Sequence, residues 1–251
     1  MEYKNAPLSE CICGVIFNHS IFTDDCLFKI NSLFSESFPI VEIHPPLFIE
    51  EVVNNHLQPV MNPVISGQVL YRRRTTDRKW LLQIQKNLIY LNWIRTDSEN
   101  VGDYVGFNKV FAKFKNILNK IKEELDIDVY ANIHLCDITY NDRIELSENG
   151  IPNLTVLEDY LNISVPSFPY ETNRILFNHR DSFVDKEIQV FGIIDLNLVV
   201  NSQKRDFLQL GIVLRGGISQ IGFDKWFEEA HLKQHSIFES VVKQKLLDKW
   251  K

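Results

Sequence analysis

Two histidines and a glutamate near the end of the chain have a spacing that chemical sites use. Glu228 precedes His231 by three residues and His235 follows it by four, so the three side chains lie on neighbouring turns of one helix face. A Glu-x-x-His pair occurs in carboxylate-bridged metal sites, and a histidine can act as a general acid or base. Two protein ligands are too few for a metal, however, and the His-Glu-x-x-His zinc motif is absent. The alternative is that both rings lie at the margin of the core and hydrogen-bond to an adjacent sheet.

A second candidate site lies in the middle of the chain, where Tyr140, Asn141 and Arg143 occur on or just after an expected strand. Side chains alternate along a strand, so Tyr140 leaves one face while Asn141 and Arg143 leave the other. An amide and a guanidinium on one face can hold a carboxylate or a phosphate. Turn bonding by the local Asn and Asp side chains is the alternative.

The clearest indication of a partner is a basic segment. Residues 71–122 contain twelve Lys and Arg against four Asp and Glu, whereas the whole chain has a net charge of −6. Guanidinium groups grip phosphate with paired hydrogen bonds, and neighbouring aromatic residues offer stacking surfaces for single-stranded bases. We expect one open cationic surface that binds an acidic protein or a nucleic acid, although the pI of about 5.7 argues against a dedicated nucleic-acid binder. Solvation, or pairing with the chain's own carboxylates, is the alternative. The candidate partner-binding residues are Arg72, Arg73, Arg74, Arg78, Lys109, Lys113 and Lys120.

No catalytic motif of high specificity is present. Phosphate-binding glycine loops and the Gly-x-Ser-x-Gly nucleophile elbow are absent, so we assign no catalytic residue, cofactor or metal. Asp195 lies in an apolar run and shares a strand face with Asn197, which indicates a polar sheet face. The cysteines lack Cys-x-x-Cys spacing, which favours buried thiols in a reducing cytosol. The weaker alternative is a zinc site built from Cys11, Cys13, Cys26 and His19.

The composition is that of a packed protein. The chain has 251 residues, of which 45% are hydrophobic and 12% aromatic, enough for one large or two small domains. The first residues are charged and lack the apolar block of a signal peptide, and no apolar run reaches the roughly 20 residues of a spanning helix. We therefore expect a cytoplasmic protein without membrane contact.

Strands and helices must position these residues. Apolar and β-branched runs predict strands, and apolar residues spaced by three and four predict helices. The clearest hairpin spans residues 80–94, where two apolar runs flank Lys86 and Asn87. The most regular amphipathic helix spans residues 104–124, with Asp103 as its N-cap. The remaining expected elements are strands at 10–17, 68–74, 79–85, 129–135 (running on into 138–146), 172–181, 188–200 and 207–215, helices at 24–36 (capped by Thr23 or Asp24) and 222–250, and a proline-rich linker at 39–63.

Each half of the chain thus places antiparallel strands before one long helix. We predict an α+β fold of two lobes, each an antiparallel sheet packed on a long helix, and we interpret the repeated order as a duplicated unit. Residues 147–169, which contain Gly150, Pro152, Pro166 and Pro169, include the boundary. The expected lobes are residues 1–147 and 148–251.

Three stretches resemble a sporadically distributed bacterial family of uncharacterised proteins of similar length. They are residues 3–17, residues 138–144 and the terminal helix with Glu229, His231, Phe238 and Trp250. In the second stretch Thr139 replaces the arginine that the family favours. The patchy occurrence of the family is similar to that of phage-defence and toxin–antitoxin genes. The resemblance therefore implies a protein that works beside a partner encoded nearby.

Together these observations favour a non-enzymatic interaction, adaptor or inhibitor subunit of such a bacterial conflict system. One alternative is a nucleic-acid-binding component that uses the basic residues 71–122. Another is a hydrolase or nuclease centred on Glu228 and His231.

Overall fold

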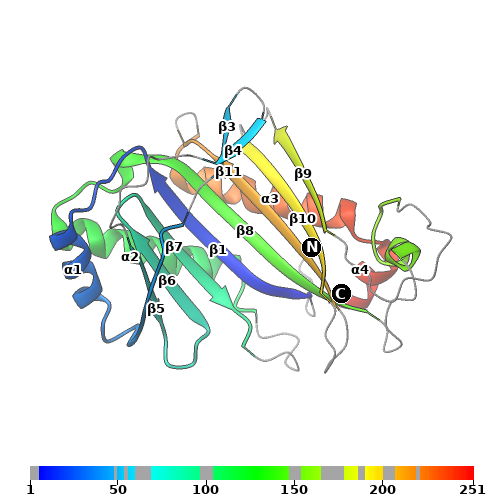
Figure 1. Cartoon of the computed structure of the whole chain (residues 1–251), viewed down its shortest axis with the longest axis horizontal. Helices are drawn as coiled ribbons and strands as arrows, with labels where there is room; N and C mark the ends of the chain where they lie inside the picture. The colour runs from blue at the N-terminus through cyan, green and yellow to red at the C-terminus, as the bar shows by residue number, and fades with distance from the viewer. Residues whose placement is uncertain are drawn as a thin grey trace.

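Nine strands form one continuous antiparallel sheet at the centre of the protein (Figure 1). The computed structural model describes residues 6–47, 50–53, 56–59, 69–96, 104–146, 154–164, 178–185, 190–199, 207–218 and 221–251. The strand order is β2-β5-β6-β7-β1-β8-β11-β10-β9. The α+β class is confirmed. The two expected lobes are joined within this sheet, because β8 (Ile133–Glu145) from residues 1–147 pairs with β11 (Phe207–Gly216) from residues 148–251.

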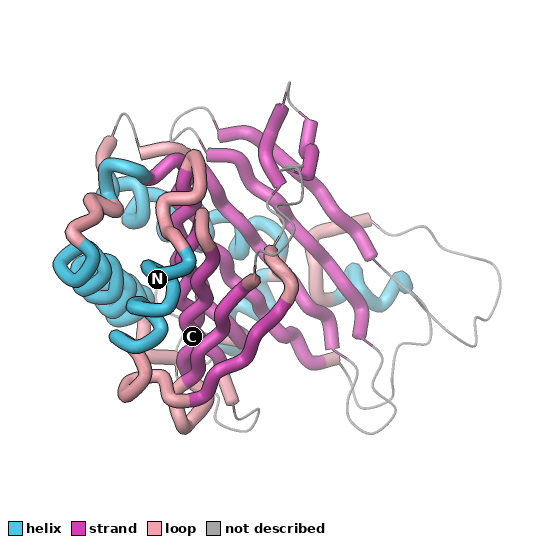
Figure 2. The backbone as a smooth tube through the Cα atoms, turned by 60° about the vertical axis from the view of Figure 1, so that its left-hand side comes forward, coloured by secondary structure: helices cyan, strands magenta, loops and turns pink. Residues whose placement is uncertain are grey.

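The strands run between the following residues. They are β1 Leu8–Phe17, β2 Ile40–His44, β5 Leu70–Arg74, β6 Trp80–Gln85, β7 Leu88–Ile94, β8 Ile133–Glu145, β9 Asn178–Asp185, β10 Val190–Val199 and β11 Phe207–Gly216. A separate two-stranded sheet consists of β3 Glu50–Val53 and β4 His56–Pro59. Figure 2, turned by 60°, shows how the strand directions rotate across the large sheet, as expected from the right-handed twist of strands.

The long helices pack on one side of this sheet (Figure 1). Helix α2 (Phe107–Leu125) contacts β1 and β7, and α3 (Phe223–Val241) contacts β8 and β11. The two helices meet through their aromatic residues, with the rings of Phe111 and Phe227 4.8 Å apart. Gln234 of α3 ties its helix to the sheet, because its Nε2 donates to the carbonyls of Ile138 and Ile212 at 3.0 and 2.8 Å. The other helices are α1 Asp24–Leu33, α4 Gln244–Trp250 and the 3-10 turns η1 Tyr130–Asn132 and η2 Leu154–Asp159.

The strands have two chemically different faces. The face beneath α2 and α3, here called the helix face, is apolar and carries Cys11, Cys13 and Val15 of β1, Cys136, Ile138 and Tyr140 of β8, and Leu210, Ile212 and Leu214 of β11. The alternating residues form the opposite face, here called the second face. They include Glu10 and Ile12 of β1, Asp137, Thr139 and Asn141 of β8, and Arg215 of β11. This alternation places the candidate site residues on opposite sides of the sheet.

Local patterns predicted most elements correctly. The hairpin of β6 and β7 turns at Lys86 and Asn87, and α1 has Thr23 as its N-cap, whose hydroxyl accepts from the backbone of Cys26. The proline-rich residues 39–63 were wrongly expected to be a linker, since they contain β2, β3 and β4. The strand expected from 129 that runs on to 146 is the continuous β8, but it begins later than expected, at Ile133, because η1 occupies Tyr130–Asn132. Of the strand expected at 172–181, residues 172–177 lie outside the described residues and the rest falls in β9.

The start of α2 differs from the expectation. The N-cap is Gly106, with φ 87° and ψ 145°, and the helix begins at Phe107. Asp103 lies outside the described residues. Gly106 has backbone dihedral angles that essentially only glycine adopts. The start of α2 is therefore set by the backbone conformation of Gly106, and no side chain caps it.

The last helix is interrupted and is not the single helix expected at 222–250. α3 ends at Val241, and α4 begins at Gln244. Asn162 meets the end of α3: its backbone N–H donates to Val241 O at 2.7 Å and its side chain donates to Ser240 O at 2.9 Å. The last carbonyls of a helix lack partners within the helix, and these bonds satisfy them where the helix stops. None of the described helices has the length and apolar character needed to cross a membrane.

Candidate binding face on the sheet

A row of polar side chains crosses the second face of the sheet. Asn141 of β8 lies beside Glu10 of β1, and its Nδ2 donates to Glu10 Oε2 at 2.7 Å. On the other side, Asn92 Nδ2 of β7 donates to Glu10 Oε1 at 2.6 Å. Gln83 Nε2 of β6 donates in turn to Asn92 Oδ1 at 3.0 Å. Side chains from four neighbouring strands are thus joined in one hydrogen-bonded chain.

The row continues toward the far edge of the sheet. Gly211 of β11 pairs with Asn141 on one side and with Asp195 of β10 on the other. Asp195 forms an ion pair with Arg180 of β9 at 3.1 Å. A Cβ on Gly211 would lie 3.1 Å from Asn141 Oδ1 and 3.6 Å from Asp195 Cβ, so glycine leaves space between them. The polar row is defined as Gln83, Asn92, Glu10, Asn141, Asp195 and Arg180.

Glu10, the carboxylate at the centre of the polar row, has acceptor positions to spare. Its side chain is partly buried. Within the described part of the chain, its carboxylate is bound only by the amides of Asn92 and Asn141. A carboxylate has about four acceptor positions, so about two remain for another donor. Asp195 has a cation beside it, whereas Glu10 has none among the described residues. Glu10 is therefore suited to accept a cationic or amide group of a ligand.

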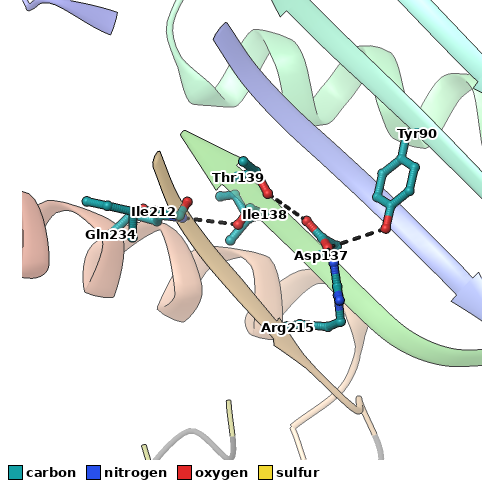
Figure 3. Close-up of polar contacts among 7 residues, drawn as sticks. All are labelled: Tyr90, Asp137, Ile138, Thr139, Ile212, Arg215 and Gln234. Atoms are coloured by element: carbon teal, nitrogen blue, oxygen red, sulfur yellow. Dashed lines mark hydrogen bonds and ion pairs between the residues drawn. The ribbon is translucent and has the colours of Figure 1, made fainter. Parts of the chain in front are cut away.

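A buried ion pair flanks the polar row (Figure 3). Asp137 of β8 accepts from Arg215 Nε of β11 at 2.8 Å and from Thr139 Oγ1 at 2.9 Å. The Tyr90 hydroxyl of β7 donates to the same carboxylate at 3.3 Å, and burial raises the pKa of Tyr90, so the hydroxyl keeps its proton. The Tyr90 ring reaches Asp137 by lying across Gly14 of β1, where a Cβ would be 1.8 Å from Tyr90 Cδ1. The cluster joins β7, β8 and β11, and the Asp137 carboxylate and the Arg215 guanidinium are bonded to each other within it.

The three consecutive arginines lie on both faces of β5. Arg73 is buried on the helix face, where its Nε donates to Asn31 Oδ1 at 2.9 Å and its Nη1 donates to Phe38 O at 2.7 Å. Arg72 and Arg74 leave the second face, and Arg74 Nε lies 3.3 Å from a carboxylate oxygen of Glu42. Alternation along the strand therefore separates them.

The remaining basic residues lie elsewhere. Arg78 is exposed in the turn before β6, with a positive φ of 59°. Lys109 and Lys120 are exposed on α2, on the helix side of the sheet. Lys113 packs its ammonium over the rings of Phe38 and Trp80 at 5.4 and 5.1 Å, and burial lowers its pKa. The seven candidates do not converge on one surface, so the expected single cationic surface is not what the structure has.

The tyrosine and histidine candidates meet within the molecule. Tyr140 lies on the helix face, and its hydroxyl is 2.7 Å from His231 Nδ1. The His231 ring stacks on Phe107 at 4.1 Å and lies 4.7 Å from the ring of His235. Burial, followed by the proximity of His235, lowers the pKa of His231 to about 4, so the ring is neutral at pH 7. Glu228 is exposed on the preceding turn of α3. His231 thus has the core-margin position, bonded to a side chain of the sheet, that the alternative interpretation described.

Asn141 and Arg143 share the second face, as alternation predicts, but they have different neighbours. Asn141 belongs to the polar row, while the guanidinium of Arg143 lies 4.1 Å above the ring of Phe207 and 4.0 Å from Glu145. The two are therefore not arranged as one anion site.

The cysteines are free in the structure. Cys11, Cys13 and Cys136 are buried, and Cys26 is partly buried on α1, where its Sγ accepts from the Thr23 hydroxyl. The described ranges contain no cluster of three or more His, Cys, Asp and Glu that could hold a metal ion. The zinc set considered from the sequence is thus not assembled.

Sequence reasoning missed most of the polar row. The signal was present as single polar residues inside apolar strands, namely Glu10, Gln83 and Asn92. Only Asn141 and Asp195 were recognised from the sequence. The role of a single polar residue in a strand depends on its cross-strand neighbours, and these are known only once the strands are paired. Comparison with protein-family models finds no matching family, and comparison with curated proteins finds no matching relative.

Proposed function

We propose that this protein is a non-enzymatic interaction subunit that binds a partner protein at Glu10 and Asn141 of the polar row, which are partly buried, whereas Gln83 and Asn92 are buried beside them. The observation that carries the proposal is Glu10, a partly buried carboxylate held in place by two amides, with acceptor positions left over. Lysine, arginine or amide side chains of a partner segment are the donors that match it, and a charge-assisted bond of this kind is stronger than a neutral one.

The charge pattern of the second face favours a protein over a nucleic acid. Four of its arginines have carboxylate partners among the described residues, and these ion pairs lower the positive potential that a phosphate backbone needs. The pairs are Arg74–Glu42, Arg143–Glu145, Arg180–Asp195 and Arg215–Asp137. A nucleic-acid-binding role for residues 71–122 is therefore less well supported.

The hydrolase alternative has similarly little support. His231 is stacked on Phe107 and bonded to Tyr140, while Glu228 points to solvent. An acid–base pair acts on a substrate within reach of both groups. We therefore propose a binding role, in the cytoplasm of a bacterium, beside a partner encoded nearby. The resemblance described above supports an antiviral-defence or toxin–antitoxin setting.

We also infer that the two halves are copies of one unit. The strand order is mirrored about the β1–β8 pair, with β7, β6 and β5 on one side and β11, β10 and β9 on the other. Helices α2 and α3 have 19 residues each. Both follow a glycine with positive φ, Gly106 and Gly222, and both begin Gly-Phe-x-Lys-x-Phe. A repeated motif at a repeated conformation supports duplication more strongly than strand order alone.

The proposed function is tested by co-expressing the chain with the products of its neighbouring genes and weighing the complexes by native mass spectrometry. We expect a stoichiometric complex that Glu10→Gln weakens about 10-fold or more, the loss typical of a hydrogen bond to a charged group. Glu228→Gln is the matched control on the helix side and leaves the complex intact. A complex indifferent to Glu10→Gln excludes the polar row as the interface. The absence of any complex with those products contradicts an interaction role.

A further inference from the structure

The outer edge of β2 is unusually apolar. β2 is the first strand of the large sheet and pairs with β5 on one side only, within the part of the chain that the structure describes. Val41 and Ile43 are 46% and 63% exposed. Edge strands present unpaired N–H and C=O groups, and proteins usually protect them with charges, prolines or bulges. An edge that displays β-branched residues is therefore open to another strand.

An exposed aromatic residue lies on the same side of this edge. Val41 pairs in register with Arg73, whose guanidinium reaches Asn31 of α1. Phe28 lies three residues before Asn31, on the same side of α1, and is 74% exposed. The edge patch is defined as Phe28, Val41 and Ile43, which are half of the large hydrophobic residues exposed in the described chain.

The charged residue within β2 does not protect this side. Glu42 alternates to the second face, where it is bonded to His44 and Arg74. At the opposite end of the sheet, β9 carries Arg180 and Asp185 in ion pairs. β9 also exposes a β-branched residue, Val184, which is 51% exposed. Among the described residues, β2 exposes two such residues on one side of the edge strand, Val41 and Ile43.

The surroundings of the edge patch are positive. Arg73 is a buried guanidinium whose bonds go to neutral acceptors, the Asn31 side chain and the Phe38 carbonyl. Burying a charge without a counter-charge is unfavourable, and the desolvation lowers the pKa of Arg73. Lys113 lies over the Phe38 ring, and the exposed Lys29 follows Phe28. A negatively charged ligand would offset this excess.

The positive charge around the edge patch also favours one kind of binding partner over another. In a dimer formed by β2 against β2 of a second copy, Arg73, Lys29 and Lys113 of one copy would approach those of the other. The acid within β2, Glu42, is on the other face and is already bonded to His44 and Arg74. Like charges across an interface disfavour association, so an acidic segment of a different protein fits better than a second copy.

We propose that the outer edge of β2 accepts an extended acidic segment of a partner protein as a tenth strand, with its apolar side chains against Phe28, Val41 and Ile43. Main-chain hydrogen bonds supply the affinity in this mode, and alternate side chains supply the specificity. The proposal does not depend on the polar row, which lies on the other face of the sheet.

The probe is an end-capped nine-residue peptide of alternating Glu and Val, labelled for fluorescence anisotropy. We expect saturable binding, at least 10-fold weaker for the Lys and Val counterpart. Ile43→Glu should weaken binding at least 10-fold. Leu232→Glu is the matched control, because Leu232 is also 63% exposed but lies on α3, and it should leave binding unchanged. Amide exchange in β2 should slow when the peptide is bound.

Other results overturn the proposal. No binding at millimolar peptide, equal binding of the Lys and Val peptide, or equal effects of the two variants each contradict it. A concentration-dependent dimer in sedimentation that Ile43→Glu dissociates would assign the edge to a second copy. Glu10→Gln should leave peptide binding unchanged, which separates this test from that of the polar row.

Discussion

The contact between Gly14 and Tyr90 allows a sharp test of how the central strands are held. The Tyr90 ring lies across Gly14, so that a Cβ on Gly14 would be 1.8 Å from Cδ1 and 1.9 Å from Cε1. The ring has little freedom to move aside, because it is buried and its hydroxyl donates to Asp137 at 3.3 Å. Gly14→Ala must therefore displace the ring from its position.

The expected loss follows from two opposing effects. Overpacking in a filled core costs about 1–3 kcal/mol, and a hydrogen bond to a charged group that is lost with the ring contributes about 1.5–3 kcal/mol. Replacing glycine by alanine in a strand returns about 0.5–1 kcal/mol. The net destabilisation is about 3 kcal/mol, which for a chain of this length lowers Tm by about 6–12 °C.

The energetic coupling between Gly14 and Tyr90 is measured by urea denaturation of the original protein, the two single variants and the double variant. In a Tyr90→Leu background the ring is gone, so Gly14→Ala should cost less than about 1 kcal/mol, and the coupling should exceed about 1.5 kcal/mol. Gly217→Ala is the control, since a Cβ there meets only His134 O, at an ordinary 3.5 Å. If the effects of Gly14→Ala and Tyr90→Leu on the free energy of unfolding are additive, or if Gly14→Ala leaves that free energy unchanged, the position of the Tyr90 ring does not depend on the missing side chain at Gly14.

Three further outcomes are expected from denaturation experiments. Burial raises the pKa of Asp142 from 3.8 to about 7; the folded protein therefore binds a proton between these values that the unfolded chain does not, and stability should fall by about 2–4 kcal/mol as pH rises through that window. Asp142→Asn should flatten the profile measured from pH 4 to 8, and an unchanged slope would contradict this. Gly222→Ala should cost about 1–3 kcal/mol, because φ is 80° there; an unaltered thermal midpoint would show that the helix start tolerates a side chain. Arg215→Met should cost about 3–5 kcal/mol by leaving the buried Asp137 uncompensated, and Asp137→Leu added to it should recover most of the loss; failure to recover would mean that the pair itself stabilises the fold.

Residue patterns near one another in the chain predicted the elements well. The spacing of apolar residues in 104–124 predicted α2, and Lys86 with Asn87 predicted the turn of the hairpin. Alternation along β8 correctly placed Tyr140 opposite to Asn141. These predictions succeed because helix and strand periodicity depend on residues a few positions apart.

The interruption of the last helix had no comparable local signal. α3 ends where Leu161 and Asn162, about eighty residues earlier in the chain, bond to its last turn. Boundaries of this kind depend on which segments meet, and that information is not contained in a short window.

The candidate sites divide in the same way. The local sequence was enough to mark Tyr140, His231 and the basic residues as chemically notable and to assign a strand or helix to each. The contacts that these residues make are set by the strands that lie beside them in the sheet. The pairing of β1 with β8 joins Glu10 to Asn141 across 131 positions, and the pairing of β2 with β5 buries Arg73 while Ile43 stays exposed. Periodicity is encoded within a few residues, whereas the order of strands in a sheet results from contacts between distant segments that bury the most apolar surface together.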